Sequence, residues 1–372
     1  MKWSFRITTI LGTEVRVHAT FALLLAFVAW QSMRQGQGAS AAVESMLLVC
    51  AMFTCVLLHE FGHVLAARRY GIKTPDITLL PIGGVARLER MPRKPSEELV
   101  VALCGPLVNV IIAAVIALVA GIIIPHGPDA TFMRPGHFWV TLMGWNILMV
   151  LFNLVPAFPM DGGRVLRALL AMMMADYAKA TRWAATIGQT LAVTVVVWMV
   201  MENKFQPMLL LIAFFVFFAA GQEATQVTSH EAARDLRVRD AMLTDFRSLP
   251  PNALLREAVD HLIAGSQHDF PVLDEHGGMM GMVTRHRLIQ ALADHGPAYP
   301  AQLIIERCGD PLEPAMSLAP AMDLLNSSGC PALPVIDPMS ERLVGLLTAE
   351  NVGETLLVRA ALRQRLTAIN RA

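Results

Sequence analysis

The chain has 372 residues and no formal net charge; 55% of its residues are hydrophobic and only 16% are charged. Soluble domains carry about 25% charged residues, so this composition excludes a wholly soluble protein, and zero net charge gives no indication of a nucleic-acid partner. Apolar residues are concentrated in 1–221, whereas the rest of the chain has ordinary soluble composition. The sequence therefore predicts a multi-pass α-helical membrane domain followed by a soluble domain.

Membrane-spanning helices are predicted from the length of the apolar runs, since a span needs about 17–25 mostly apolar residues. The first and the last run are short, and the second contains charged and histidine side chains that lower its hydropathy. We expect about six transmembrane helices, at 17–33, 43–66, 98–124, 138–158, 183–201 and 207–221.

The distribution of basic residues predicts the orientation of these helices. Lysine and arginine gather in 68–94 and 159–182, whereas the loops near 34–42, 125–137 and 202–206 carry few. By the positive-inside rule the basic segments face the cytoplasm, and both termini then lie there too. We therefore expect a protein of the cell (inner) membrane with cytoplasmic termini.

The second apolar segment contains the sequence His59-Glu60-Phe61-Gly62-His63. Two histidines four residues apart lie on one face of a helix, so both imidazoles can bind one metal ion. The glutamate between them can take a proton from a water molecule at that ion. Charged groups are costly in a membrane, which favours a functional role. The alternative is that both histidines form hydrogen bonds within a helix bundle.

The segment 77–89, between the second and third apolar runs, differs from the helices around it. It is rich in β-forming residues and is broken by Pro81, Gly83 and Gly84. A hairpin-like or re-entrant element fits this pattern better than a loop in free water. Non-helical backbone at membrane depth needs cover from protein or a water-filled cavity, and an exposed strand edge there can receive an extended peptide.

The fourth apolar segment ends in Asn-Leu-Val-Pro-Ala-Phe-Pro-Met-Asp-Gly-Gly, residues 153–163. Pro156 and Pro159 break the helix, and the two glycines after Asp161 permit an unusual turn. A catalytic zinc ion needs three protein ligands and leaves a fourth position for water, and such an unwound segment can direct the Asp161 carboxylate at the metal. The alternative is that Asp161 is a helix-end or turn residue in water.

These separated motifs resemble those of the site-2 protease family of intramembrane zinc metalloproteases, peptidase family M50. The family pattern is HExxH on one transmembrane helix and N-x-x-P-x-x-P-x-D-G on a later one, and both stand here, at 59–63 and 153–162. Gly-Pro-Leu-Val-Asn at 105–109 and Pro-Ile-Gly-Gly at 81–84 are also similar to family features. The resemblance covers about residues 10–221, and within the family it indicates the bacterial branch that carries C-terminal CBS domains.

The resemblance implies an intramembrane endopeptidase with one Zn²⁺ ion per chain. Its substrate would be a membrane-embedded or membrane-associated protein, such as a membrane-tethered regulator. By the resemblance, Asn109 and Asn153 would hold the substrate backbone; interhelical hydrogen bonds within the bundle are the alternative for both. The implied metal ligands and general base are His59, His63 and Asp161, and Glu60.

A CBS-regulated ion transporter or channel is the rival interpretation. In such a protein the His/Glu/Asp cluster would form a cation pathway, because ionisable residues inside a membrane also mark ion routes. Purified protein distinguishes the two: the enzyme holds zinc and cuts peptide, and the transporter moves ions in vesicles. An inactive membrane scaffold is a further alternative, against which the intact metal set argues.

The C-terminal part of the chain repeats itself. Phe-Pro-Val-Leu-Asp at 270–274 recurs as Leu-Pro-Val-Ile-Asp at 333–337, and Gly-Met-Val-Thr at 281–284 recurs as Gly-Leu-Leu-Thr at 345–348. Each copy combines helical patterns with two short apolar strands. This predicts a soluble tandem of small α/β modules, which resembles a CBS domain pair.

The predicted domain organisation has three parts. A transmembrane metalloprotease domain spans 1–221, a polar linker spans 222–234, and the CBS pair spans 235–372, with modules at about 235–296 and 300–360. The CBS pair also offers a surface through which two chains could form a homodimer, and the membrane domain is expected to contact lipid.

CBS pairs often bind adenosine nucleotides through a Gly-h-h-Thr/Ser-x-x-Asp element, in which h is hydrophobic and the aspartate holds the ribose. Thr284 and Thr348 fit this element, but the aspartate positions are Arg287 and Asn351. Asparagine can still hydrogen-bond a ribose, whereas arginine suits a phosphate better. An adenine nucleotide between the modules is therefore one prediction, and a ligand-free docking or dimerisation module is the alternative.

Overall fold

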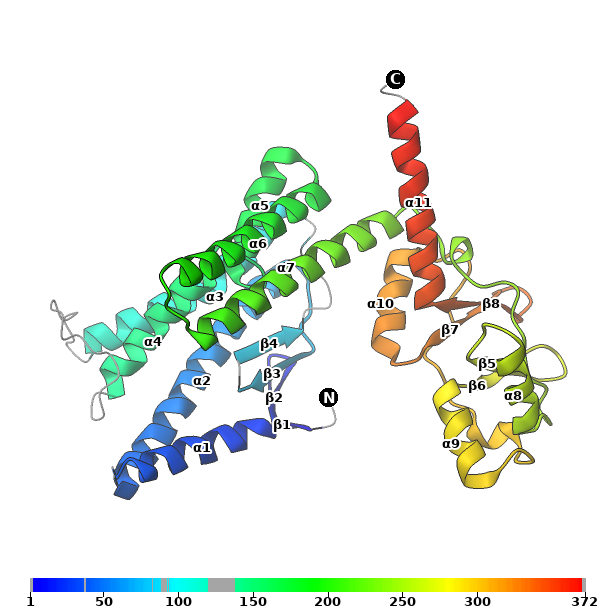
Figure 1. Ribbon diagram of the computed structural model, residues 1–372, viewed down its shortest axis with the longest axis horizontal. Coiled ribbons are helices and arrows are strands. Elements are labelled where there is room, and N and C mark those ends of the chain that lie inside the picture. The colour runs from blue at the N-terminus through cyan, green and yellow to red at the C-terminus, as the bar shows by residue number, and fades with distance from the viewer. Residues whose placement is uncertain are drawn as a thin grey trace. The chain divides into compact units, whose positions relative to one another are not determined.

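The computed structural model describes residues 3–36, 38–81, 83–87, 92, 94–119 and 138–369. The chain divides into two compact units, Met1–Thr225 and Gln226–Ala372. The first unit combines apolar helices with a four-stranded sheet, and the second contains two small α/β modules (Figure 1). The predicted fold class is confirmed.

The helices of the first unit follow the predicted apolar segments. Two shorter apolar helices are α1, Thr20–Arg34, and α4, Phe138–Asn153. The predicted loop at 125–137 lies outside the described residues, as does the end of the third predicted segment. Four described helices are long and apolar enough to cross a membrane: α2 (Gly38–Arg69), α3 (Pro95–Val119), α6 (Tyr177–Met201) and α7 (Pro207–Ala233).

Helix α5, Asp161–Met174, is an additional short helix between α4 and α6. Gly163, Arg167 and Ala171 recur every four residues and form its buried stripe. Two of these residues are small, so α5 can approach its neighbours closely. The helix ends just before Asp176, which caps α6 by accepting a hydrogen bond from a backbone amide at 2.9 Å.

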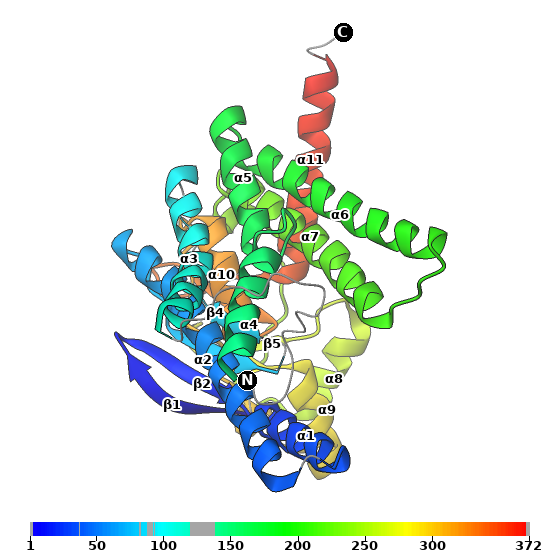
Figure 2. The same cartoon turned by 90° about the vertical axis from the view of Figure 1, so that its left-hand side faces the viewer.

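A four-stranded sheet packs against α2. Strands β2 and β3 run parallel, and the two outer pairs are antiparallel. Val15 and Ile77 of the sheet pack on Phe61 of α2, and both views show the sheet beside that helix (Figure 1, Figure 2). The strands, in their order across the sheet, are β1 (Ser4–Ile10), β2 (Thr13–His18), β3 (Asp76–Leu80) and β4 (Gly83–Arg87).

The β3–β4 hairpin lies on the β-rich segment predicted at 77–89. Residues 82, 88 and 89 of that segment lie outside the described residues. The hairpin is covered on one side by α2, which contacts both of its strands. Cover of this kind is what irregular backbone near a membrane needs.

The second unit contains two copies of one arrangement. Each strand pair is an antiparallel hairpin with a register shift at the equivalent point, after Val272 in the first copy and after Val335 in the second. The first copy comprises α8 (Leu255–Ala264), β5 (Phe270–Leu273), β6 (Met279–Val283) and α9 (Arg285–His295), and η2 (Ala301–Ile304) packs in its core. The second comprises α10 (Leu318–Ser328), β7 (Ala332–Ile336), β8 (Leu343–Thr348) and α11 (Ala349–Ile369), and η1 (Val238–Asp240), which precedes the first copy in the chain, packs in its core.

The predicted linker at 222–234 is helical over most of its length, because α7 continues to Ala233. The glutamine, glutamate and alanine residues in this stretch favour a helix, although the stretch as a whole is polar. The boundary between the compact units falls after Thr225. The domain limits at 221 and 235 stay a prediction.

Candidate metal centre

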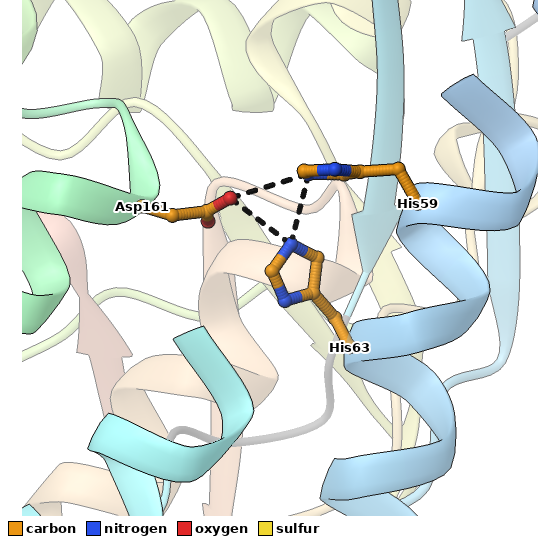
Figure 3. A group of neighbouring side chains, drawn as sticks. All are labelled: His59, His63 and Asp161. Atoms are coloured by element: carbon orange, nitrogen blue, oxygen red, sulfur yellow. Dashed lines mark hydrogen bonds and ion pairs between the residues drawn. The ribbon is translucent and has the colours of Figure 1, made fainter. Parts of the chain in front are cut away.

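Three side chains that are distant in the sequence meet beside α2. His59 and His63 lie one turn apart on that helix, and Asp161 is the first residue of α5. Asp161 Oδ2 lies 3.2 Å from Nε2 of each histidine, and the two Nε2 atoms are 3.1 Å apart (Figure 3). All three residues are buried, with at most 6% of their surface exposed. One ion can therefore contact all three.

The other nitrogen of each imidazole is already engaged. His59 Nδ1 donates to Oδ1 of Asn109 at 2.6 Å, and His63 Nδ1 donates to the carbonyl of Val101 at 2.8 Å. Both partners are oxygen acceptors, so each Nδ1 carries the ring proton. Each Nε2 then presents a lone pair to the centre of the cluster.

This donor set fits a zinc ion. Two imidazole lone pairs and one carboxylate oxygen converge, and Asp161 Oδ2 has no hydrogen-bond donor among the described residues. In a tetrahedral site with bonds of about 2.0–2.2 Å, neighbouring ligand atoms are about 3.3–3.6 Å apart. The observed separations of 3.1–3.2 Å are close to that value. A cation supplies the attraction that three electron-rich atoms at this distance otherwise lack.

Both histidine rings pack directly on Gly105 of α3. A Cβ atom at Gly105 would lie 2.2 Å from Nε2 of His63 and 2.8 Å from Nε2 of His59. A larger residue would displace the rings or α3. The glycine of the predicted Gly-Pro-Leu-Val-Asn motif therefore makes room for the metal-binding edges of both rings.

The turn that leads into α5 orients Asp161. Met160 is extended, with φ −68° and ψ 159°, and α5 begins directly after it. Cβ atoms at Gly162 and Gly163 would lie 2.3 Å and 2.6 Å from backbone atoms of the preceding turn. Only glycine lets the first turn of α5 pack so closely on residues 154–158. The two glycines thus place the carboxylate at the start of α5, facing the histidines.

Glu60 lies on α2 between the two histidines and is half-buried. Its side chain runs along β4, where a Cβ atom at Gly84 would lie 2.8 Å from Cγ and 3.2 Å from Oε1 of Glu60. In the helix Glu60 directly follows His59 and precedes His63 by three residues, so it lies next to both imidazole-bearing positions. The glutamate therefore lies beside both the histidine–aspartate cluster and an outer strand of the described sheet.

A chain of amides leads from His59 into the helix bundle. Asn109 Nδ2 donates to Asn146 Oδ1 at 2.7 Å, and Asn146 Nδ2 donates to the carbonyl of Leu142 at 2.8 Å. Both asparagines are fully buried, which for Asn109 favours the interhelical hydrogen bond over contact with substrate. Sequence reasoning missed Asn146, although an amide inside an apolar segment is a usable signal. Asn153 is half-buried at the end of α4, and no hydrogen bond joins its side chain to another described residue.

The predicted nucleotide residues form two pairs, one in each module. Thr284 Oγ1 and Arg287 Nε both donate to Glu306, at 3.2 and 2.7 Å, and Arg287 holds the pKa of that carboxyl below its usual value. Thr348 Oγ1 donates to Asn351 Oδ1 at 3.0 Å, and the backbone N–H of Asn351 donates to Thr348 Oγ1 at 3.1 Å. Sequence reasoning missed Glu306, which lies outside the repeated motif.

Models of two known families match this chain. The model described as Peptidase family M50 matches residues 47–132 and 120–195, and the CBS domain model matches 238–294. Zinc metalloprotease MJ0392 of Methanocaldococcus jannaschii is 32% identical over 285 residues, which cover 76% of this chain and 78% of that protein. The chain belongs to peptidase family M50. For this M50 protease, membership of the family implies that the metal is zinc.

The M50 protease is also similar to a bacterial protein and to a solved structure. Stage IV sporulation protein FB of Bacillus subtilis is 28% identical over 136 residues, which cover 36% of this chain and 43% of that protein. The solved structure of the site-2 protease from Methanocaldococcus jannaschii has 36% sequence identity and covers 60% of this chain and 95% of that chain, with a TM-score of 0.43. The M50 protease is thus a membrane zinc metalloprotease with a C-terminal CBS pair, and the transporter interpretation is disfavoured.

Proposed function

We propose that this M50 protease is an intramembrane endopeptidase in which His59, His63 and Asp161 hold one zinc ion per chain and Glu60 is the general base. The observation that supports this assignment is the convergence of two imidazole nitrogens and one buried carboxylate oxygen beside a half-buried glutamate. Peptide hydrolysis by such enzymes needs a Lewis acid and a base side by side. The arrangement provides a position for each.

The residues of the chain have separate tasks in hydrolysis. When bound, zinc polarises the scissile carbonyl and lowers the pKa of water towards about 7. Glu60 takes a proton from the attacking water onto a carboxylate oxygen and passes it to the nitrogen of the leaving amine. Asn109 and Val101 keep the ring protons of His59 and His63 on Nδ1, so that both Nε2 atoms remain free to bind metal.

The proposed substrate is an extended segment of a membrane protein, such as a membrane-tethered regulator, that lies beside β4. Among the described strands, β4 pairs with β3 only, and Gly84 brings its backbone against the Glu60 side chain. A peptide that pairs with this edge would be held by main-chain hydrogen bonds, with its scissile bond close to Glu60. Asn153 is the second proposed contact to the substrate backbone.

Under the same proposal, the protein lies in the cell (inner) membrane with both termini in the cytoplasm. The basic residues of 68–94 and 159–182 support this orientation. Cysteine labelling of intact cells from outside tests it: cysteines placed in 34–42 should react, and a cysteine at Ser266 should not. External labelling at Ser266 would invert the orientation.

The CBS pair is proposed to alter the cleavage rate by binding an adenine nucleotide near Thr284, Arg287, Thr348 and Asn351. The charge of Arg287 suits a phosphate, although Glu306 occupies its Nε in the structure. A ligand changes the rate only if it binds one arrangement of the protein more tightly than another. A homodimer contact is the alternative role. Failure of ATP, ADP and AMP to bind the full-length protein at millimolar concentration would remove the nucleotide proposal.

The substitution Glu60→Gln tests the proposed chemistry directly. The amide keeps the size of the side chain but cannot accept the proton, so cleavage of a peptide substrate should fall by about 100-fold or more. Zinc should remain at one ion per chain, because Glu60 is not a ligand. Glu44→Gln, the same change on the same helix away from the cluster, is the matched control. Wild-type activity in Glu60→Gln, or wild-type protein without zinc, would end the proposal.

A further inference from the structure

Arg167 on α5 is a charged residue with no exposed surface, and the proposed chemistry does not use it. Burying a charge is costly unless the charge is paired and hydrogen-bonded. A buried ion pair contributes little net stability compared with well-packed apolar residues, so its presence points to a need for a defined arrangement. The contacts of Arg167 show which segments of the protein it holds in place.

The guanidinium of Arg167 is paired with two carboxylates and lies over two aromatic rings. Its Nε donates to Glu98 Oε1 at 2.8 Å, its Nη2 donates to the same oxygen, and its Nη1 donates to Glu223. Its Cζ lies 5.0 Å from the ring centroids of both Phe158 and Tyr177. Because these partners come from α3, α7, α6 and the turn before α5, they fix both the position and the direction of the planar fork.

Two of these contacts bracket Asp161 in the chain. Phe158 precedes Asp161 by three residues, in the turn that leads into α5, and Arg167 follows it by six residues on α5. The amide of Met160 donates to the carbonyl of Ala157 at 3.0 Å and closes the turn between them. Arg167 therefore holds the chain on both sides of the carboxylate that faces the histidines.

Glu98 connects the same arginine to the histidine side of the centre. Glu98 and Val101 are three residues apart on α3 and are therefore neighbours on one face of that helix. The carbonyl of Val101 accepts the proton of His63 Nδ1 at 2.8 Å. The ion pair between Arg167 and Glu98 thus joins the helix that begins with Asp161 to the helix that orients His63.

We propose that Arg167 is a positioning residue: by holding α5 against α3, it keeps the Asp161 carboxylate within metal-binding distance of His59 and His63. The inference rests on the zinc site proposed above. A lysine would retain the charge but would lose the planar guanidinium and its contacts with the aromatic rings. Arginine therefore provides hydrogen bonds of fixed direction, which lysine cannot. Groups that orient metal ligands contribute about 10–100-fold to metal affinity.

The test compares Arg167→Lys with Leu170→Ala in the full-length protein. Leu170 lies on the same helix and packs in the same cluster as Phe158, so its truncation loosens α5 but leaves the ion pairs intact. Zinc affinity is measured by competition with a chromophoric chelator, and ligand geometry by the visible absorption of Co²⁺ bound in place of zinc. We expect Arg167→Lys to weaken zinc binding about tenfold and to shift the cobalt bands. Leu170→Ala should lower the melting temperature of the metal-free protein but retain the cobalt spectrum and an affinity within about twofold of wild type.

Wild-type affinity and a wild-type cobalt spectrum in Arg167→Lys would overturn the inference. Equal losses in both variants would also overturn it, since loose packing would then explain them. Wild-type protein that binds no zinc would refute the proposed metal site itself, independently of Arg167. If Arg167→Lys does not fold, Glu223→Gln replaces it, because the Glu223 side chain is 29% exposed and the amide keeps its size. In that variant we expect zinc affinity to fall about threefold, and an unchanged affinity would overturn the inference.

Discussion

Replacing Gly105 with alanine tests whether the two histidine rings have room to move. In a helix interior this change ordinarily stabilises a protein by about 0.8–1.0 kcal/mol, because glycine is the weaker helix former. Here the new Cβ would lie 2.2 Å from Nε2 of His63 and 2.8 Å from Nε2 of His59. Non-bonded heavy atoms need about 3.5 Å, so the His63 ring or α3 must shift by about 1.3 Å.

A shift of that size is large for a metal site, where ligand distances vary by only about 0.2 Å. The His63 ring cannot turn away freely, because its Nδ1 is held by the carbonyl of Val101 and the residue is buried on all sides. Misplacement of a reacting group by about 1 Å costs about 100-fold in rate. For Gly105→Ala we therefore expect about 100-fold lower activity and zinc affinity about 10–100-fold below wild type.

The assay measures zinc affinity by chelator competition and cleavage of a peptide substrate on the same preparation. Gly221→Ala is the matched control, since it is the same change in an apolar helix and, among the described residues, its Cβ would meet only the end of the Gln189 side chain, at 3.2 Å. The control should keep wild-type zinc affinity and activity. If Gly105→Ala also kept wild-type zinc affinity and activity, the histidine rings could move aside without loss of function. That result would show that α3 does not fix their position.

Three further substitutions test other parts of the molecule. Asp161→Ala removes one of the three proposed ligands, so zinc retention under mild chelation and turnover should both fall; stoichiometric zinc with persistent turnover would make Asp161 a structural residue. Asn146→Ala leaves Asn109 Nδ2 with only the weak thioether acceptor of Met149, at 3.7 Å, and zinc affinity should fall about tenfold; an unchanged affinity would show that Asn109 holds its histidine without Asn146. Glu306→Gln removes the carboxylate beside Arg287, so ATP should bind the full-length protein up to about fivefold more tightly at neutral pH. Because Arg287 lowers the pKa of Glu306 below the usual 4.5, this difference should disappear only as the pH falls below that value; unchanged ATP affinity at neutral pH would place the phosphates away from Arg287.

The membrane helices could be predicted from the sequence because hydropathy is a local property of the chain. Strands β1 and β2 could not, because most of β1 is exposed, so that no buried face marks it, and β2 runs directly into the first apolar run. The parallel pairing of β2 with β3 joins Glu14–Val17 to Asp76–Leu79, and no local pattern specifies a partner about 60 residues away. Of the sheet that brings β4 beside Glu60, only the β3–β4 hairpin could therefore be predicted from the sequence.

The candidate site divides in the same way. His59, His63 and Asp161 could be predicted as candidate ligands because the HExxH spacing, and the proline and glycine residues around Asp161, are local features of the sequence. Arg167 and Asn146 were missed because each acts through partners on other helices. A side chain that orients another one needs proximity in space, and that proximity leaves no fixed spacing in the sequence.

Helix α3 supplies none of the proposed metal ligands, yet it contacts both histidines and the arginine of α5. Glu98, Val101, Gly105 and Asn109 follow one another at intervals of three or four residues and therefore lie on one buried face of the helix. Glu98 pairs with Arg167 of α5, and the carbonyl of Val101 accepts the ring proton of His63. Gly105 makes room for both rings, and Asn109 accepts the ring proton of His59. The opposite face of α3 carries exposed leucine, valine and isoleucine. Polar and small residues at helical spacing within an otherwise apolar segment are thus the signal by which the face that builds this centre can be recognised.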